Sequence, residues 1–181
     1  MNKLIYIFLS LILLVGCSCS FLTNTPTKKV EELLNKYRTL DEDITNQIDT
    51  VTSDASYTAS QKEIYRDIIK KQYKDLTYEI KDETVDGDEA TVEVEIEVYD
   101  LNKSINKAEA YRDTNPNDLK DNNGTFSDNL YIDYKLDLMK KEKERVKYTI
   151  SFTLVKIDDE WNLDDLTETQ REKIHGIYDY N

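Results

Sequence analysis

Glycine, proline, cysteine and histidine are scarce in this chain of 181 residues, with four, two, two and one copies respectively. Behind the N-terminal segment only Gly87, Gly124 and Gly176 remain. They lie too far apart to form a phosphate-binding loop or a dinucleotide-binding fingerprint. A lone histidine does not make a metal site. The scarcity of glycine therefore excludes both nucleotide-binding enzyme classes, and we expect no cofactor and no metal.

Basic side chains are also in deficit, with 24 Lys and Arg against 37 Asp and Glu and a formal net charge of −13. Affinity for nucleic acid comes from basic side chains that displace counterions from phosphates. A strongly acidic chain repels both phosphate backbones and anionic lipid headgroups. We therefore expect no nucleic-acid partner.

The longest apolar run lies at the N-terminus, where Lys3 precedes the segment from Leu4 to Val15. A transmembrane helix needs about 20 apolar residues, so this run is too short to span a membrane and is typical of a signal peptide. The sequence Leu14-Val15-Gly16-Cys17 that follows resembles the bacterial lipobox. The resemblance implies a diacylglycerol thioether on Cys17, cleavage directly before it, and a further acyl group such as palmitate on the new amino terminus. The alternative is an ordinary secretory signal followed by an unrelated cysteine.

These features predict three segments, namely a removed signal peptide over 1–16, a lipidated cysteine and tether over 17–25, and a single α+β domain over 26–181. Removing 16 of the 181 residues leaves 165, with 23 basic against 37 acidic side chains and a net charge of −14. That length suffices for one hydrophobic core. Because Cys19 is then the only free thiol, the domain contains no internal disulfide.

Helical periodicity predicts two helices in the first half of the chain. Thr25 can cap a helix that begins with Pro26, and apolar residues from Val30 to Ile48 recur at helical spacing, which predicts one long helix. A second helix is predicted from about residue 60. Its inward residues are Ile64, Tyr65, Ile68, Ile69 and Tyr73.

Apolar and polar residues alternate in four later segments, which predicts four strands in two hairpins. The first hairpin has Leu76, Tyr78 and Ile80 on one strand and Val92, Val94, Ile96 and Val98 on the other, with its turn at Asp86-Gly87. The second has a long strand over 145–157, a turn at Asp158-Asp159 and a last strand with Trp161 and Leu163.

The segment between the two hairpins is predicted to be helical with an irregular centre. We expect a short helix over about 104–112, a loop over 117–124 and a helix over about 128–141. The inward residues of the last helix are predicted to be Leu130, Tyr134, Leu138 and Met139. Near the C-terminus, Thr167 and Gln170 form a capping box for a short helix that Gly176 ends.

This order predicts an α+β fold. N-terminal helices pack on one face of a curved antiparallel sheet of about four strands, a helical insertion separates the two hairpins, and a short helix closes the chain. The order, together with the strand that ends at Lys156 to Leu163, resembles the nuclear-transport-factor-two-like fold, a cystatin-like α+β arrangement, over roughly 26–176. The resemblance implies a cone of helices around the sheet. Members of that family include enzymes and non-catalytic binding proteins, and no catalytic motif carries over to this chain.

A candidate ligand pocket is predicted where the insertion meets the sheet, between the first two helices and the apolar sheet face. Tyrosine hydroxyls and an apolar floor suit sugars, peptides or a partner protein. The alternative is that these tyrosines belong to the core. The candidate residues are Tyr111, Tyr131, Tyr134, Tyr148, Val94, Ile96, Ile150 and Phe152.

Two polar features have ordinary explanations that we favour over functional ones. His175 could act as an acid or base, but a role in capping the carbonyls of its helix is the favoured interpretation. The loop over 118–128 is rich in oxygen ligands, but aligning it with the helix-loop-helix calcium motif places Leu119 and Leu130 at ligand positions. We therefore favour a solvated turn over a weak calcium site.

A row of glutamates on the second predicted strand is interpreted in the same way. Glu93, Glu95 and Glu97 project from one face of a strand and could meet a basic partner. Cross-strand lysines, for which Lys81 and Lys147 are suitably placed, make a solvated face the favoured interpretation.

The sequence thus favours a lipid-anchored extracytoplasmic protein at the cell surface that binds an envelope protein, a peptide or a small ligand without catalysis. An enzyme of the same fold with a carboxylate and tyrosine pocket, and a structural acidic component of the envelope, are the alternatives. An apolar cavity that holds a carboxylate of raised pKa would favour the enzyme, and an exposed aromatic patch would favour the binding protein.

Overall fold

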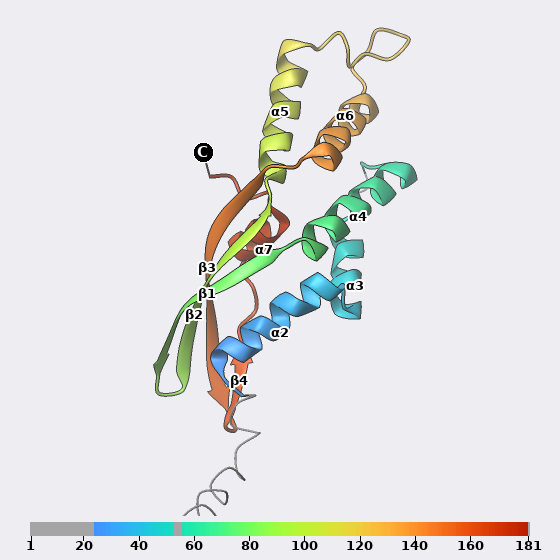
Figure 1. Ribbon diagram of the computed structural model, residues 1–181. Coiled ribbons are helices and arrows are strands. Elements are labelled where there is room, and N and C mark those ends of the chain that lie inside the picture. The colour runs from blue at the N-terminus through green and yellow to red at the C-terminus, as the bar shows by residue number, and fades with distance from the viewer. Residues whose placement is uncertain (1–23, 53–55, 181) are drawn as a thin grey trace, which may run out of the picture.

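The computed structural model describes residues 24–52 and 56–180, in which six helices and four strands form the α+β fold predicted from the sequence. Helices α2, α3, α4 and α7 lie on one side of a curved sheet, and the α5–α6 pair extends past one end of it (Figure 1). The predicted signal peptide over 1–16 and the lipidation site Cys17 lie outside the described residues. No helix in the described part of the chain is both long and apolar enough to cross a membrane.

The sheet is an open antiparallel meander whose spatial order equals its chain order. Alternate side chains of its two central strands are buried, and Val92 lies opposite Phe152 while Val94 lies opposite Ile150. The predicted alternation is therefore confirmed. The strands are β1 (Thr77–Asp86), β2 (Glu89–Tyr99), β3 (Arg145–Ile157) and β4 (Glu160–Leu163).

Both hairpins turn through two residues with backbone angles suited to the right-handed twist of the strands. In the first, Asp86 pairs with Glu89, so the loop is Gly87-Asp88, one residue later than predicted, and Gly87 has a φ of 61°. In the second, Asp158 and Asp159 have φ values of 50° and 64°, as a type I′ turn requires.

The prediction of one long N-terminal helix is wrong. Helix α2 (Pro26–Thr39) ends at Leu40, which is left-handed with a φ of 53°, and the side chain of Asp41 accepts the Asp43 N–H at the start of α3 (Glu42–Val51). The apolar stripe continues across the break, because Ile44 and Ile48 stay buried.

Helix α4 (Ala59–Lys74) follows the predicted second helix. Thr58 and Gln61 form a reciprocal capping box at its start. Ile68, Ile69 and Tyr73 are buried as predicted, whereas Ile64 and Tyr65 are only half-buried.

The insertion forms α5 (Leu101–Thr114) and α6 (Asp128–Lys141), which pack against each other, while α6 also contacts α4. Helix α5 is longer than predicted because Asp100 caps it through the Lys103 N–H. The predicted inward face of α6 is partly wrong. Its buried residues are Ile132, Leu136 and Met139, whereas Leu130 is 40% exposed, because α6 packs on two helices and not on the sheet.

Helix α7 (Glu168–His175) has the predicted Thr167–Gln170 capping box and ends at a left-handed Gly176. It also covers the edge of β3 beyond the short strand β4. The side chain of Gln170 donates to the Ser151 carbonyl at 2.7 Å, and Lys173 Nζ donates to the Thr149 carbonyl at 2.9 Å. These bonds occupy carbonyls that an exposed sheet edge would offer to another chain.

Candidate functional site

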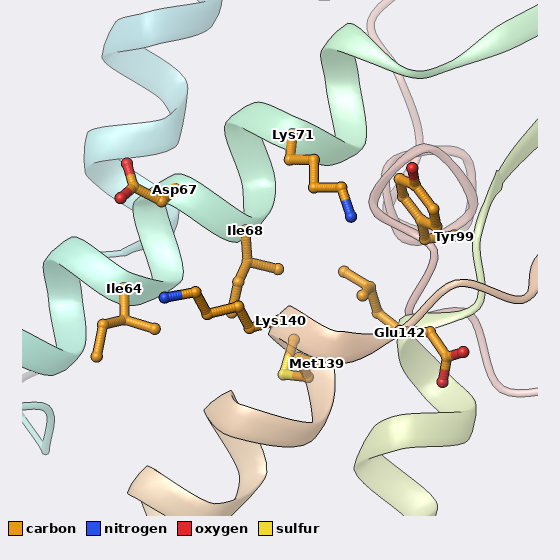
Figure 2. A pocket seen from close by; sticks show the side chains of 9 residues that line it. Ile64, Asp67, Ile68, Lys71, Tyr99, Met139, Lys140 and Glu142 are labelled. Carbon is orange, nitrogen blue, oxygen red and sulfur yellow. The ribbon is translucent and has the colours of Figure 1, made fainter.

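An apolar pocket of about 190 Å³ opens between α4, α6 and the junction of β2 with α5 (Figure 2). Ile64 and Ile68 are one helical turn apart on α4 and lie on the same side of the helix. Leu101 of α5 and Met139 of α6 complete the apolar wall, and the ring of Tyr99 closes one end.

Tyr99 is held rigidly as the end wall. The side chain of Gln72 bonds both main-chain groups of Tyr99, with Oε1 accepting the N–H and Nε2 donating to the carbonyl, each at 2.9 Å. The phenol donates to Asp75 at 2.8 Å, and Lys71 Nζ and the Arg145 guanidinium lie 4.2 and 5.1 Å from the ring centroid. The hydrogen bond to Asp75 and partial burial raise the pKa of the Tyr99 hydroxyl.

Glu142 lines the pocket with its aliphatic part, while its carboxylate turns away toward α5 (Figure 2). The carboxylate accepts the Ser104 hydroxyl at 2.7 Å and the backbone N–H groups of Lys143 and Glu144 at 2.9 Å. Burial acts to raise the pKa of Glu142, but the N–H of Glu144, the Ser104 hydroxyl and the N–H of Lys143 together lower it below its usual value. This carboxylate is therefore ionised at neutral pH and fully engaged in holding the end of α6.

Lysines border the pocket although the chain is strongly acidic. Lys71 and Lys140 line it together with Asp67, and an adjoining depression adds Lys141, Lys143 and Asp137. Lys141 pairs with Asp137 at 2.6 Å, whereas Lys140 and Lys143 have no ion-pair partner within the residues that the structure describes. The lysines at the end of α6 also interact favourably with the helix dipole, but that role leaves their ammonium groups free to meet an anion.

Three of the predicted pocket tyrosines come together on the α5–α6 pair. The rings of Tyr111 and Tyr134 stack with their centroids 4.3 Å apart. The Arg112 guanidinium lies 5.3 Å from the centroid of the Tyr131 ring. Tyr148 lies elsewhere, on β3, and the centroid of its ring is 5.8 Å from that of Tyr178.

The apolar residues predicted for the same pocket fill the core. Val94, Ile96, Ile150 and Phe152 are at most 2% exposed and belong to one cluster of buried side chains with residues of α2, α4 and α7. They line neither the pocket of Figure 2 nor the groove described below. Sequence periodicity identified Ile64 and Ile68 as inward residues, but their approach to Met139 depends on how the insertion packs on α4, which no local pattern encodes.

A second, larger cavity of about 790 Å³ forms a groove between α2, α3 and α7. His175, the last residue of α7, lines it and is only 8% exposed, with its ring 5.7 Å from that of Tyr73. Burial, with a smaller contribution from Arg171, lowers the pKa of His175 to about 4, so the imidazole is neutral at pH 7.

The expected capping role of His175 is wrong. Within the described residues its imidazole makes no hydrogen bond, and the N–H of Gly176 contacts the carbonyls of Glu172 and Lys173 instead. What His175 contributes to packing is its backbone carbonyl, which accepts Gln72 Nε2 at 2.9 Å.

The acidic features have local partners. Asp118 accepts the Tyr111 hydroxyl at 2.7 Å, and Asp121 accepts the N–H groups of Asn123 and Thr125 at 2.8 and 3.0 Å. Across the sheet, Lys147 Nζ lies 2.7 Å from Glu95, as predicted for a solvated face. Over 24–52 and 56–180, no group of three or more His, Cys, Asp or Glu side chains is placed to hold a metal ion.

Comparison with known proteins gives one distant likeness. No protein-family model matches the chain, and no curated protein does so. Among solved structures, the chain is similar to a candidate lipoprotein, ycdA, from Bacillus subtilis subsp. subtilis str. 168, with 16% identity and a TM-score of 0.39. The match covers 90% of this chain but 50% of the other, so the chain spans about half the length of that protein. The resemblance to the nuclear-transport-factor-two-like fold stays a prediction.

Proposed function

We propose that this protein is a membrane-anchored extracytoplasmic lipoprotein whose folded domain binds a protein partner without catalysis. The lipobox from Leu14 to Cys17 supports the anchor. The observation that carries the binding function is the apolar pocket of Figure 2, which is open, rigid at one end and bordered by lysines.

The size of this pocket favours a protein side chain over a free small molecule. Sites for drug-sized ligands usually measure about 300–1,000 Å³. At about 190 Å³, this pocket has room for one large apolar side chain. Protein interfaces commonly gain most of their affinity from one such anchor in a well-packed pocket.

The charge around the pocket favours an acidic partner segment. The whole chain carries a net charge of −13, so most of its surface repels acidic molecules. Around the pocket and the adjoining depression the balance is reversed, because four lysines, at 71, 140, 141 and 143, stand against three carboxylates, those of Asp67, Asp137 and Glu142. A partner segment with an exposed apolar residue next to carboxylates matches both features, and complementary charge of this kind fixes orientation and speeds association.

The place where the chain enters the domain keeps the pocket away from the anchor. The Asn24 side chain bonds the carbonyl of Asp159 at 2.7 Å and the N–H of Trp161 at 3.1 Å, which ties the start of the domain to the β3–β4 turn. The α5–α6 pair lies at the opposite end of the sheet (Figure 1). From Cys17 to Asn24 the chain reaches at most about 25 Å.

The buried ionisable groups support binding over catalysis. General acid–base catalysis works best with a pKa near the working pH. Hydrogen bonds keep Glu142 ionised, and burial keeps His175 neutral with a pKa of about 4.

In-cell crosslinking tests this function. A photoreactive residue at position 64, on the pocket wall, is compared with one at Val155, which is 37% exposed on β3. We expect a discrete protein adduct from position 64 alone, and at least a fivefold lower yield when Lys71→Glu and Lys140→Glu are added. Equal adduct yields from both positions would refute the proposed docking site. An adduct yield that is unchanged by Lys71→Glu and Lys140→Glu would also refute it.

A further inference from the structure

We propose that the groove between α2, α3 and α7 is a second binding site, which takes a short apolar peptide with both termini free. This site is separate from the pocket of Figure 2 and does not depend on the function proposed for that pocket. Its volume of about 790 Å³ lies within the usual range for small-ligand sites, which is about 300–1,000 Å³.

The walls of the groove are mainly apolar. Leu33 of α2 and Val51 of α3 line one part, and Leu163 and Leu166, on either side of the turn after β4, line another. Val51 is 36% exposed. Removing these side chains from water would favour a ligand with an apolar body.

Two largely buried residues of the groove wall carry polar atoms that make no hydrogen bond within the described part of the chain. The His175 imidazole and the Tyr37 hydroxyl both line it, on residues that are 8% and 1% exposed, and neither makes a hydrogen bond within the described residues. Among the described residues, the fully buried side-chain atoms without a partner are Asn102 Nδ2 and Arg145 Nε, so the polar atoms of His175 and Tyr37 still reach solvent in the groove, where a ligand can replace water. Neutral histidine offers one donor and one acceptor, and tyrosine offers both, so together they can bond the amide groups of a peptide.

The groove is lined by one guanidinium, that of Arg171, and by two carboxylates, those of Asp164 and Asp165, none of which forms an ion pair within the described residues. Arg171 bonds the Leu166 carbonyl, which fixes the guanidinium there, but has no ion-pair partner in the described part of the chain. Asp165 is exposed and likewise unpaired within that part, whereas the neighbouring Asp164 accepts the Thr153 hydroxyl at 2.7 Å. A free peptide carboxylate matches Arg171, and a free ammonium matches Asp165.

This pairing disfavours ligands with a single charge. A simple anion would meet Arg171 but would be repelled by Asp164, Asp165 and the net charge of the chain. A simple cation would be repelled by Arg171. A zwitterion with an apolar body satisfies the mouth and the walls together.

Calorimetric titration of the full mature protein in detergent tests the proposal with three dipeptide probes. Leucyl-leucine has both charges, N-acetyl-leucyl-leucine lacks the ammonium, and leucyl-leucinamide lacks the carboxylate. We expect leucyl-leucine to bind at least tenfold more tightly than either blocked form. Arg171→Gln should remove the advantage of the free carboxylate, and Asp165→Asn that of the free amine.

Arg171 and Asp165 are both exposed, so the two substitutions should leave the fold unchanged. Circular dichroism checks that each variant is folded. Lys140→Gln, in the pocket of Figure 2, serves as the control and should leave dipeptide affinity unchanged. No binding of leucyl-leucine by the wild type, equal binding of all three probes, or insensitivity to Arg171→Gln and Asp165→Asn would each overturn the proposal. Because the probes occupy the groove, these outcomes leave the crosslinking result at position 64 unaffected.

Discussion

Phe152 and Thr153 are chain neighbours on β3 that face opposite environments. Phe152 is 1% exposed in the core, whereas Thr153 is exposed and donates to Asp164 at 2.7 Å. We predict that Phe152→Ala lowers the free energy of unfolding by about 3–5 kcal/mol, because it leaves a cavity in a packed core. Thr153→Ala should cost less than about 1 kcal/mol, since its hydrogen bond is exposed to water. Denaturant titration measures both, and equal losses would contradict a sheet buried on one face.

His175 should make stability depend on pH in a defined window. Burial lowers its folded pKa from 6.5 to about 4, so between these values the unfolded chain binds more protons than the folded one. The contribution is complete well above pH 6.5 and is lost as the pH falls through 6.5 toward 4. From pH 6.5 to pH 5 the loss should be about 1.6 kcal/mol.

The matched variant for this pH dependence is His175→Gln, which has no titrating side chain. Over the same interval its unfolding free energy should fall less than that of the wild type by about 1.6 kcal/mol, the contribution of one histidine. Parallel curves for the two proteins would show that the imidazole is solvated, and not buried beside Tyr73.

At the scale of elements, Gly176 joins three of them. It has a φ of 70°, and an added Cβ would lie 2.1 Å from Gln72 Nε2 and 2.2 Å from the Tyr99 carbonyl oxygen. Gln72 can move, but the β2 backbone cannot. Gly176→Ala should therefore lower the free energy of unfolding by more than about 3 kcal/mol, from backbone strain and overpacking combined.

Gly87 provides the control for this glycine. Its φ is 61°, but a Cβ there would meet nothing within 4 Å. Gly87→Ala should cost only the strain of a left-handed residue, about 1–2 kcal/mol. Thermal or denaturant unfolding of both variants measures the difference, and similar losses would argue against the close approach of α7 to β2.

Local signals explain which elements could be predicted from the sequence. The start of α7 depends on Thr167 and Gln170, and α6 begins after a capping Ser127, so both could be located. The break after α2 could not, because Leu40 is not a residue that signals a left-handed cap and the apolar stripe runs on through Ile44. Capping residues thus predicted where helices begin, but the break between α2 and α3 could not be predicted because the apolar stripe continues across it.

At the scale of the whole molecule, the candidate sites depend on contacts between distant segments. Tyr111 and Tyr134 were predicted to gather, and they stack, because both lie on the insertion. The pocket of Figure 2 joins α4 to α5 and α6, and the groove joins α2 and α3 to α7. Ile64 and His175 were noticed in the sequence, but their surroundings follow from tertiary packing and could not be read from spacing.

The proposed function depends on presentation of the domain at a membrane by lipid on Cys17. Metabolic labelling of intact cells with a radioactive fatty acid tests this claim most directly. We predict that the wild type is labelled and processed, whereas Cys17→Ala stays unlabelled and keeps the length of the precursor, because the thioether forms only on that thiol. Normal labelling of Cys17→Ala, including transfer of the label to Cys19, would contradict the account.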